Sequence, residues 1–227
     1  MEFSKSLLAA KLQEFVSIRR EDSGLYHEVA DALPLPDTGC LLDIGTGTGL
    51  QLRVIHQLKP DLELFGLDVS ENTIRIAGRY LAPHNVNYSV GSIEKTDFKN
   101  GFFNLVTCAN SMSYWDNLKA CFDEIHRILL PGGSAHLIEP RANIDVDLAL
   151  ETIRENLEGE SLIRKFLAVN LNKFALRRGS SVGLHQYTRD EIIHISQESK
   201  FGSNVSAESF TLQNLPIFMH ITLTKPI

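Results

Sequence analysis

The chain has 227 residues, of which 43% are hydrophobic and 22% are charged, and its formal net charge is −6. This composition is typical of a globular protein, and we expect a single domain over residues 1–227. The acidic balance argues against the broad basic face that nucleic-acid binding needs, so no nucleic-acid partner is expected. We find no secretory signal and no apolar run of membrane length, which predicts a cytoplasmic protein without membrane association.

Two helices are expected at the N-terminus, within residues 1–36. Apolar residues recur at helical spacing between Phe3 and Ile18 and predict an amphipathic helix there. A second helix over residues 24–33 should end before Pro34, because proline disfavours helical backbone in the residue before it.

The stretch 41–49 joins a short apolar run to three glycines at alternate positions. Residues 39–44 have the continuous apolar pattern of a buried parallel strand, and residues 50–58 have a helical pattern. Because glycine has no Cβ, Gly45, Gly47 and Gly49 let the main chain turn sharply and approach a ligand closely. A strand, a glycine loop and a helix N-terminus in this order predict a ligand site.

The spacing of these glycines disfavours two phosphate-binding patterns. A dinucleotide-binding loop needs a third glycine where Leu50 stands, and a P-loop needs a lysine, which is absent between Cys40 and Gln57. Asp43 precedes the loop, and its negative charge repels phosphate but suits a ligand with an ammonium group. A second strand over residues 62–69 contains Asp68 near its end, where an acid can accept hydrogen bonds from ribose hydroxyls.

Strands and helices continue to alternate along the chain. Ser70 can cap a helix that reaches Tyr80. Further strands are expected over residues 85–90, 103–109 and 134–138, and a helix over residues 116–129. This alternation predicts a doubly wound α/β sheet with parallel strands and right-handed crossovers.

The segment after the fifth expected strand departs from this alternation. Two helical patterns within it predict a helical cap inserted over residues 145–187. Residues 188–191 have the sequence of a capping box that opens another helix, and residues 203–209 and 217–224 read as two final strands. The eight histidines show no metal-binding spacing, so no metal site is expected.

Four ordered segments resemble one known family. Residues 41–50 together with Asp68 resemble the S-adenosylmethionine-binding motifs of the seven-stranded, Rossmann-like methyltransferases. Residues 101–106 are similar to the fourth strand of that family, and residues 122–133 to its helix, turn and fifth strand. The resemblance implies a mostly parallel seven-stranded Rossmann-like sheet with an antiparallel last strand. It also implies S-adenosylmethionine as cofactor and S-adenosylhomocysteine as product.

The resemblance implies a role for each residue around the cofactor. Asp43 would act on the amino-acid end, Asp68 on the ribose, and Val69 on one face of the adenine. Ser92 stands where the family usually has an acid at the adenine amine, and the backbone of Ile93 could serve beside it. The remaining expected cofactor residues are Gly45, Thr46, Gly47, Gly49 and Asn110.

The acceptor side is expected at the loop after the fourth strand. Many small-molecule methyltransferases of this type carry a histidine pair there, whereas this chain has Ser113 and Tyr114. His185 and Tyr114 are the candidate catalytic residues, and a base is needed only when the acceptor holds a proton. The candidate substrate-binding residues are Tyr114, Trp115, Glu139, Arg141 and Tyr187.

These features predict transfer of a methyl group, in line, to an O, N or C nucleophile of a small-molecule acceptor. Three alternatives stay open: a non-catalytic S-adenosylmethionine-binding protein, an NAD-dependent oxidoreductase, and a methyltransferase that acts on RNA or protein. The oligomeric state is open as well, with a homodimer as one alternative.

Overall fold

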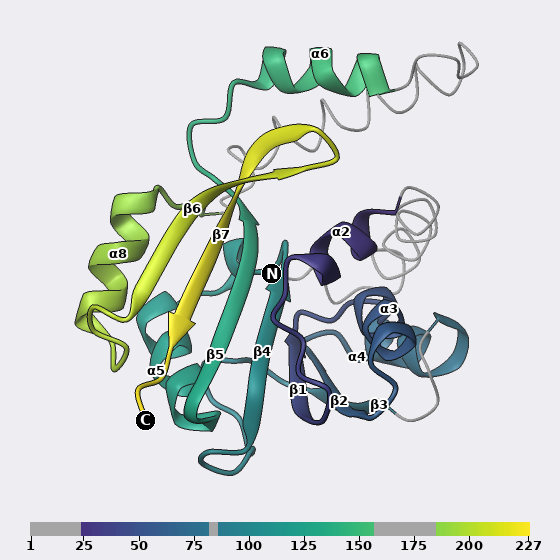
Figure 1. Cartoon of the computed structure of the whole chain (residues 1–227), viewed down its shortest axis with the longest axis vertical. Coiled ribbons are helices and arrows are strands. Elements are labelled where there is room, and N and C mark those ends of the chain that lie inside the picture. The colour runs from purple at the N-terminus through teal and green to yellow at the C-terminus, as the bar shows by residue number, and fades with distance from the viewer. Residues whose placement is uncertain (1–23, 82–85, 157–184) are drawn as a thin grey trace.

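A computed structural model describes residues 24–81, 86–156 and 185–227 of the chain, and a seven-stranded sheet forms its centre (Figure 1). The strand order is β3-β2-β1-β4-β5-β7-β6. The strands are β1 (Gly39–Ile44), β2 (Leu62–Asp68), β3 (Val86–Val90), β4 (Phe103–Ala109), β5 (Leu129–Pro140), β6 (Val205–Leu212) and β7 (Leu215–Thr224). The described helices are α2 (Leu25–Asp31), α3 (Leu50–Leu58), α4 (Glu71–Ile76), α5 (Leu118–Ile128), α6 (Val146–Asn156) and α8 (Arg189–Glu198).

The pairing of the strands confirms the expected fold class. β1 pairs in parallel with β2 and β4, β2 with β3, and β4 with β5. β7 lies between β5 and β6 and is antiparallel to both. The sheet is therefore mostly parallel, and the last strand of the chain is the one that runs the other way.

Alternate residues of the strands pack against helices on opposite faces of the sheet. Leu41 and Leu105 belong to a buried cluster with residues of α2 and α3. Leu42 and Val106, one position later in each strand, belong to a second cluster with residues of α5 and α8. This placement follows from the two-residue period of a strand, and it gives the doubly wound arrangement of Figure 1.

Several element boundaries differ from the sequence-based expectations. The fifth strand begins at Leu129 rather than at residue 134, because Leu129 pairs with Phe103 before the register shifts. Gly132 and Gly133, expected in a turn, instead exchange backbone hydrogen bonds with Lys225 near the C-terminus. The helix expected from residue 116 begins at Leu118, because the Asn117 side chain accepts a hydrogen bond from the Ala120 amide and caps it.

Other boundaries agree closely or fall partly outside the described residues. β1, α3 and β4 have the expected bounds, and Thr188 and Glu191 form the expected capping box at the start of α8. The helix after Ser70 continues from α4 into a π-helical turn, Ala77–Leu81. The helix expected over residues 3–18 lies outside the described residues. Of the predicted cap, the structure describes residues 145–156, which include α6, and residues 185–187, and its covering role stays a prediction.

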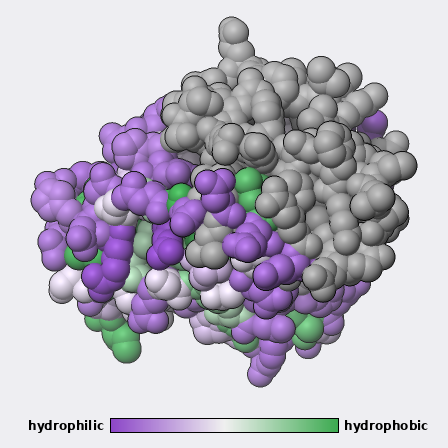
Figure 2. Space-filling model, turned by 90° about the horizontal axis from the view of Figure 1, so that it is seen from above, coloured by the Kyte–Doolittle hydropathy of each residue, from purple (hydrophilic) through white to green (hydrophobic). Residues whose placement is uncertain are grey.

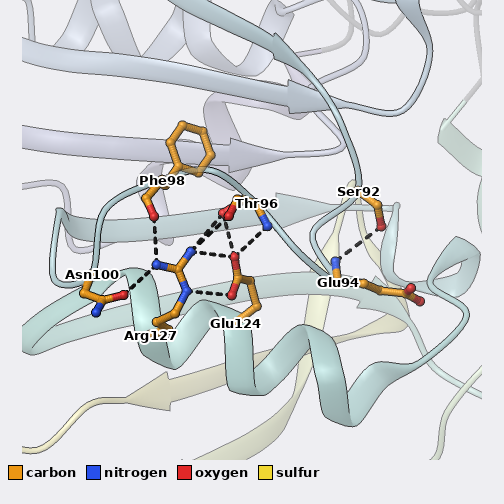
Figure 3. A network of polar contacts seen from close by, with 7 residues as sticks. All are labelled: Ser92, Glu94, Thr96, Phe98, Asn100, Glu124 and Arg127. Atoms are coloured by element: carbon orange, nitrogen blue, oxygen red, sulfur yellow. Dashed lines mark hydrogen bonds and ion pairs between the residues drawn. The ribbon is translucent and has the colours of Figure 1, made fainter.

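The connection between β3 and β4 is held to α5 by a network of polar contacts (Figure 3). The Arg127 guanidinium donates to both carboxylate oxygens of Glu124, at 2.7 Å each, and to the Phe98 carbonyl at 2.7 Å. Glu124 also accepts the amide and the hydroxyl of Thr96, both at 2.7 Å. The loop that leaves β3 is therefore fixed by one ion pair from the following helix.

None of the helices within these described residues is long and apolar enough to cross a membrane.

We expect Arg127→Lys to lower the free energy of unfolding by about 1–3 kcal/mol, because lysine keeps the charge but cannot donate in parallel to both Glu124 oxygens. Urea unfolding followed by circular dichroism measures this loss. Arg75→Lys is the matched control, because Arg75 is half-exposed and lies 3.9 Å from Glu71. It should change the unfolding free energy by less than about 0.5 kcal/mol. Equal losses of unfolding free energy in both variants would contradict a special role for the paired hydrogen bonds from Arg127 to Glu124.

A buried histidine, His136, and a half-buried one, His220, make a hydrogen-bonded pair between β5 and β7. His136 Nδ1 lies 2.9 Å from His220 Nε2, and His136 Nε2 lies 3.1 Å from the Ser134 hydroxyl. Burial, with His220 alongside, lowers the pKa of His136 to about 4, and burial also lowers the pKa of His220. The folded chain therefore favours the neutral pair.

A histidine with a lowered pKa contributes stability above its unfolded pKa of about 6.5 that is lost as the pH falls through 6.5 toward 4. We expect His136→Gln to reduce the loss of unfolding free energy between pH 7.5 and pH 5 by about 1–2 kcal/mol. Urea unfolding at both pH values measures it. His194→Gln, at an exposed position of α8, is the matched control, and the reduction should be smaller there than in His136→Gln. An unchanged dependence in His136→Gln would rule out a buried neutral pair.

Candidate functional site

The glycine loop between β1 and α3 folds back onto the end of β2. The amides of Gly45 and Thr46 donate to the Leu67 carbonyl at 2.8 and 3.1 Å. The Gly47 amide donates to Asp68 Oδ2 at 3.0 Å. Gly45, Gly47 and Gly49 have φ angles of 68°, 57° and 81°, a region that side chains disfavour. The three alternate glycines therefore make this return of the chain possible.

Gly45 is also required for the packing of the loop after β4. A Cβ placed on Gly45 would collide with the Ser111 side chain. The Ser111 hydroxyl donates to the Ile44 carbonyl at 3.2 Å, which holds it against the end of β1. Sequence reasoning did not single out Ser111, because its contact with Gly45 joins residues far apart in the chain.

Asp68 stands at the end of β2 with both of its oxygens engaged by backbone amides. Oδ2 accepts the Gly47 amide, and Oδ1 accepts the Ser70 amide at 2.8 Å. Burial raises the pKa of Asp68, and these two hydrogen bonds partly offset the shift. An ionised carboxylate has about four acceptor sites, so Asp68 can still accept hydroxyl donors from a ligand. Val69 follows it and is 46% exposed.

Asp43 lies at the carboxyl end of β1 and is only 2% exposed. Burial raises its pKa to about 7, and the nearby charge of Asp68 adds to the shift. The Thr46 hydroxyl partly offsets this shift, although it forms no hydrogen bond of standard geometry with any described residue. A buried carboxylate without a cation is costly, so Asp43 is suited to a ligand that carries positive charge.

Polar atoms without partners surround Asp43. The Tyr88 hydroxyl is buried and has no hydrogen-bond partner among the described residues, and the same is true of the Thr46 hydroxyl. Both side chains would collide with a Cβ on Gly66, so they lie together over this glycine. Burial and the charge of Asp43 raise the pKa of Tyr88, which keeps its hydroxyl protonated. Buried unpaired polar groups are unfavourable, so this corner fits a polar ligand.

The loop after β3 contains the residues expected near the adenine. Ser92 is exposed, and its hydroxyl accepts the Glu94 amide at 3.3 Å. The Ile93 side chain is buried in the core. Glu94 Oε1 in turn accepts the Asn117 amide at 2.8 Å, which ties this loop to the start of α5. Figure 3 shows this loop and its contacts with Arg127 and Glu124.

The loop after β4, residues 110–115, is the rim loop of the site. Asn110 has a left-handed backbone with φ of 59°. Tyr114 is 59% exposed, whereas Trp115 is partly buried against the core. Figure 2 views the molecule from above in Figure 1, the end at which the parallel strands finish. The described surface there is mostly hydrophilic, with small apolar areas between the polar ones.

The other predicted acceptor residues differ in exposure. His185 is exposed, its amide donates to the Ser113 carbonyl at 3.3 Å, and its ring lies 4.3 Å from that of Tyr187. Tyr187 itself is buried in the core, and Arg141 is exposed at the end of β5. The structure thus brings His185 to the rim loop. Direct contact of these residues with a substrate stays a prediction.

Glu139, also predicted at the acceptor side, is fully buried. Its Oε1 accepts the amides of Ser111 and Met112 at 2.8 and 3.0 Å and the Cys108 thiol at 3.2 Å. Burial raises the pKa of Glu139 to about 7. Its carboxyl group therefore faces the rim loop backbone inside the protein.

Comparison with known proteins agrees with this arrangement. A model of the methyltransferase domain family matches residues 42–137. An uncharacterised methyltransferase of Bacillus subtilis is 31% identical over 102 residues, which cover 44% of this chain and 56% of that protein. A ubiquinone/menaquinone biosynthesis C-methyltransferase of Desulfotalea psychrophila is 26% identical over 153 residues, which cover 66% of this chain and 61% of that protein. The chain thus spans less than two thirds of the length of both relatives.

A solved structure shares the fold over nearly the whole chain. It is a Haloferax volcanii methyltransferase in complex with the Trm112 methyltransferase activator, with a TM-score of 0.65 and 14% identity. The alignment covers 95% of this chain and 97% of that one. Residues 42–137 thus match the methyltransferase domain family, and the sheet has the Rossmann-like fold of solved methyltransferases.

Proposed function

We propose that this chain binds S-adenosylmethionine at the carboxyl ends of β1 and β2 and transfers its methyl group to a small-molecule acceptor at the rim loop. One observation carries the proposal. The glycine loop is closed on Asp68 by the 3.0 Å hydrogen bond from Gly47, and it leaves the buried Asp43 carboxyl beside the unpaired hydroxyls of Thr46 and Tyr88. This corner offers acceptors for ribose and a carboxylate for an ammonium group.

The chain would hold the two ends of the cofactor by different physical means. Asp68 is fixed by two backbone amides and retains acceptor capacity for ribose hydroxyls. Asp43 is buried, and an ammonium group beside it would favour its ionised form and lower its pKa. The exposed Val69 side chain and the backbone of the loop at Ser92 and Ile93 would enclose the adenine.

The bound cofactor supplies an electrophilic methyl group on a sulfonium centre. The protein has to bring the acceptor into line with that group and exclude water, and positioning alone can supply much of the catalysis. His185 and Tyr114 are the groups that could take a proton from an acceptor hydroxyl, amine or activated carbon. Both are exposed beside the rim loop, so an acceptor there could reach them.

Small-molecule acceptors are favoured by the relatives. The Desulfotalea protein carries the name of a C-methyltransferase of quinone biosynthesis, which favours a carbon nucleophile on a small molecule; oxygen and nitrogen acceptors stay within the proposal.

Ligand binding tests the donor site. We expect S-adenosylmethionine and S-adenosylhomocysteine, but not NAD, to raise the melting temperature. A ligand at about 100 times its Kd adds about 2.7 kcal/mol of stability. Asp68→Ala should abolish the shift, and Asp61→Ala, at the exposed turn before β2, should retain it. Stabilisation by NAD alone, or a full response in Asp68→Ala, would contradict the assignment.

Label transfer tests the catalytic part of the proposal. With methyl-labelled S-adenosylmethionine, extracts of small metabolites should yield a labelled product that is missing with Asp68→Ala. Tight cofactor binding without transfer to any extract would favour a non-catalytic binding protein. Label found in RNA or protein fractions instead would support a macromolecular acceptor.

A trade-off between stability and binding should appear at Asp43. A carboxyl group with a raised pKa destabilises the fold above that pKa, and the cost is relieved as the pH falls from about 7 toward 4. We expect Asp43→Asn without ligand to unfold with a free energy about 1–3 kcal/mol higher at pH 8, and with a smaller gain at pH 5. It should bind S-adenosylhomocysteine more weakly. Calorimetry of unfolding and ligand titration measure the two effects, and a loss of stability at pH 8 would contradict the raised pKa.

A further inference from the structure

The rim loop is shaped from inside the protein by one carboxylate. Glu139 Oε1 accepts the amides of two consecutive residues, Ser111 and Met112, at 2.8 and 3.0 Å. The preceding residue, Asn110, has a left-handed φ of 59°. Successive amides that converge at such a turn form an anion-binding concavity. Here the anion is a side chain of the chain itself.

The same loop also touches the donor site. Ser111 packs over Gly45 so closely that no Cβ could fit there, and its hydroxyl donates to the Ile44 carbonyl. Three and four residues later come Tyr114 and Trp115, on the acceptor side. The loop therefore stands between the glycine loop and the acceptor residues, and Glu139 holds it at its first turn.

Direct contact of Glu139 with an acceptor is disfavoured by its surroundings. The side chain is 0% exposed, its Oε1 is shared by two amides and the Cys108 thiol, and its Oε2 is enclosed within the protein without a partner among the described residues. Glu139 lies on the same face of β5 as Ala135 and Leu137, because the three residues alternate along the strand, and these two are buried in the core on the α5 side. Its carboxyl group therefore acts on the loop backbone.

We propose that Glu139 is a positioning residue for methyl transfer, which fixes the rim loop between donor and acceptor through the backbone of Ser111 and Met112. This inference rests on the proposed function for its catalytic meaning. The fixing of the loop itself is a property of the free protein and can be tested without a known acceptor.

Trp115 is the chain's only tryptophan, so its fluorescence reports on the rim loop alone. At pH 8 we expect Glu139→Leu to raise the acrylamide quenching constant of Trp115 about twofold, because two buried amides lose their acceptor and the loop opens. Glu139→Gln should give a smaller rise, because the amide oxygen still accepts but without a charge.

Hydrogen exchange provides a second test of the proposal, and the conservative variant Glu139→Gln is sufficient for it. In Glu139→Gln the amides of residues 110–115 should exchange about tenfold faster than in the wild type, since a neutral acceptor replaces a charged one. Unchanged exchange and unchanged quenching in Glu139→Gln overturn the proposal, even if Glu139→Leu does not fold.

Glu124→Gln is the matched control. It also replaces a largely buried carboxylate that accepts a backbone amide, that of Thr96 at 2.7 Å, but in the network of Figure 3. It should lower global stability and leave Trp115 quenching and exchange at residues 110–115 as in the wild type. A similar response at Trp115 in both variants would reduce Glu139 to a general contribution to stability and overturn the proposal.

Titration with S-adenosylhomocysteine separates this inference from the proposed function. Glu139→Gln should bind it within about threefold of the wild-type Kd, because the Asp43 and Asp68 contacts are intact. Loss of binding as severe as in Asp68→Ala would move Glu139 into the donor pocket and overturn its positioning role. If the wild type itself does not bind S-adenosylhomocysteine, the proposed function is contradicted. Trp115 quenching and hydrogen exchange still test whether Glu139 fixes the loop.

Discussion

The Asp68 carboxylate accepts the amide of Gly47 through one oxygen and that of Ser70 through the other. These two hydrogen bonds join the glycine loop, the end of β2 and the start of α4 at one point. Because the loop is drawn onto β2, its glycines have left-handed backbones and Asp43 becomes enclosed beneath it. The placement of the loop, the burial of Asp43 and the exposure of Val69 all depend on this junction.

Two carboxyl groups at this edge of the sheet are buried, yet they are stabilised differently. Burial raises the pKa of both Asp43 and Glu139 to about 7. Glu139 Oε1 accepts hydrogen bonds from the backbone of the rim loop, whereas Asp43 lies beside the Thr46 and Tyr88 hydroxyls, which have no partner of standard geometry among the described residues. A buried carboxyl group with a raised pKa beside unpaired hydroxyls is a marker of function, since it costs stability unless a ligand compensates it. Asp43 fits the binding of a cation, and Glu139 fits the support of a loop.

Local pattern was sufficient to predict the elements whose stability is local. β1 and β4 are continuous apolar runs, and the Thr188 capping box closes over four residues, so their places follow from short windows of sequence. The early start of β5 could not be predicted, because it depends on pairing with Phe103 and with Lys225 near the C-terminus. Glu139 was expected to face a substrate. Its two-residue spacing from Leu137 was the available signal that it faces inward.

The rim loop combines a backbone that is fixed from inside the protein with side chains that are exposed at the surface, and this combination suits methyl transfer. Methyl transfer in line requires the acceptor to be held accurately, but it requires an acid or base only for some acceptors. In the rim loop the backbone is held from inside by Glu139, while Tyr114 is left 59% exposed at the surface. Under the proposed function, substitution at Tyr114 would change the choice of acceptor and leave the hydrogen-bonded backbone in place. A loop built this way would separate accurate positioning, which depends on buried hydrogen bonds, from the choice of acceptor, which depends on exposed side chains, and one fold could then serve many acceptors.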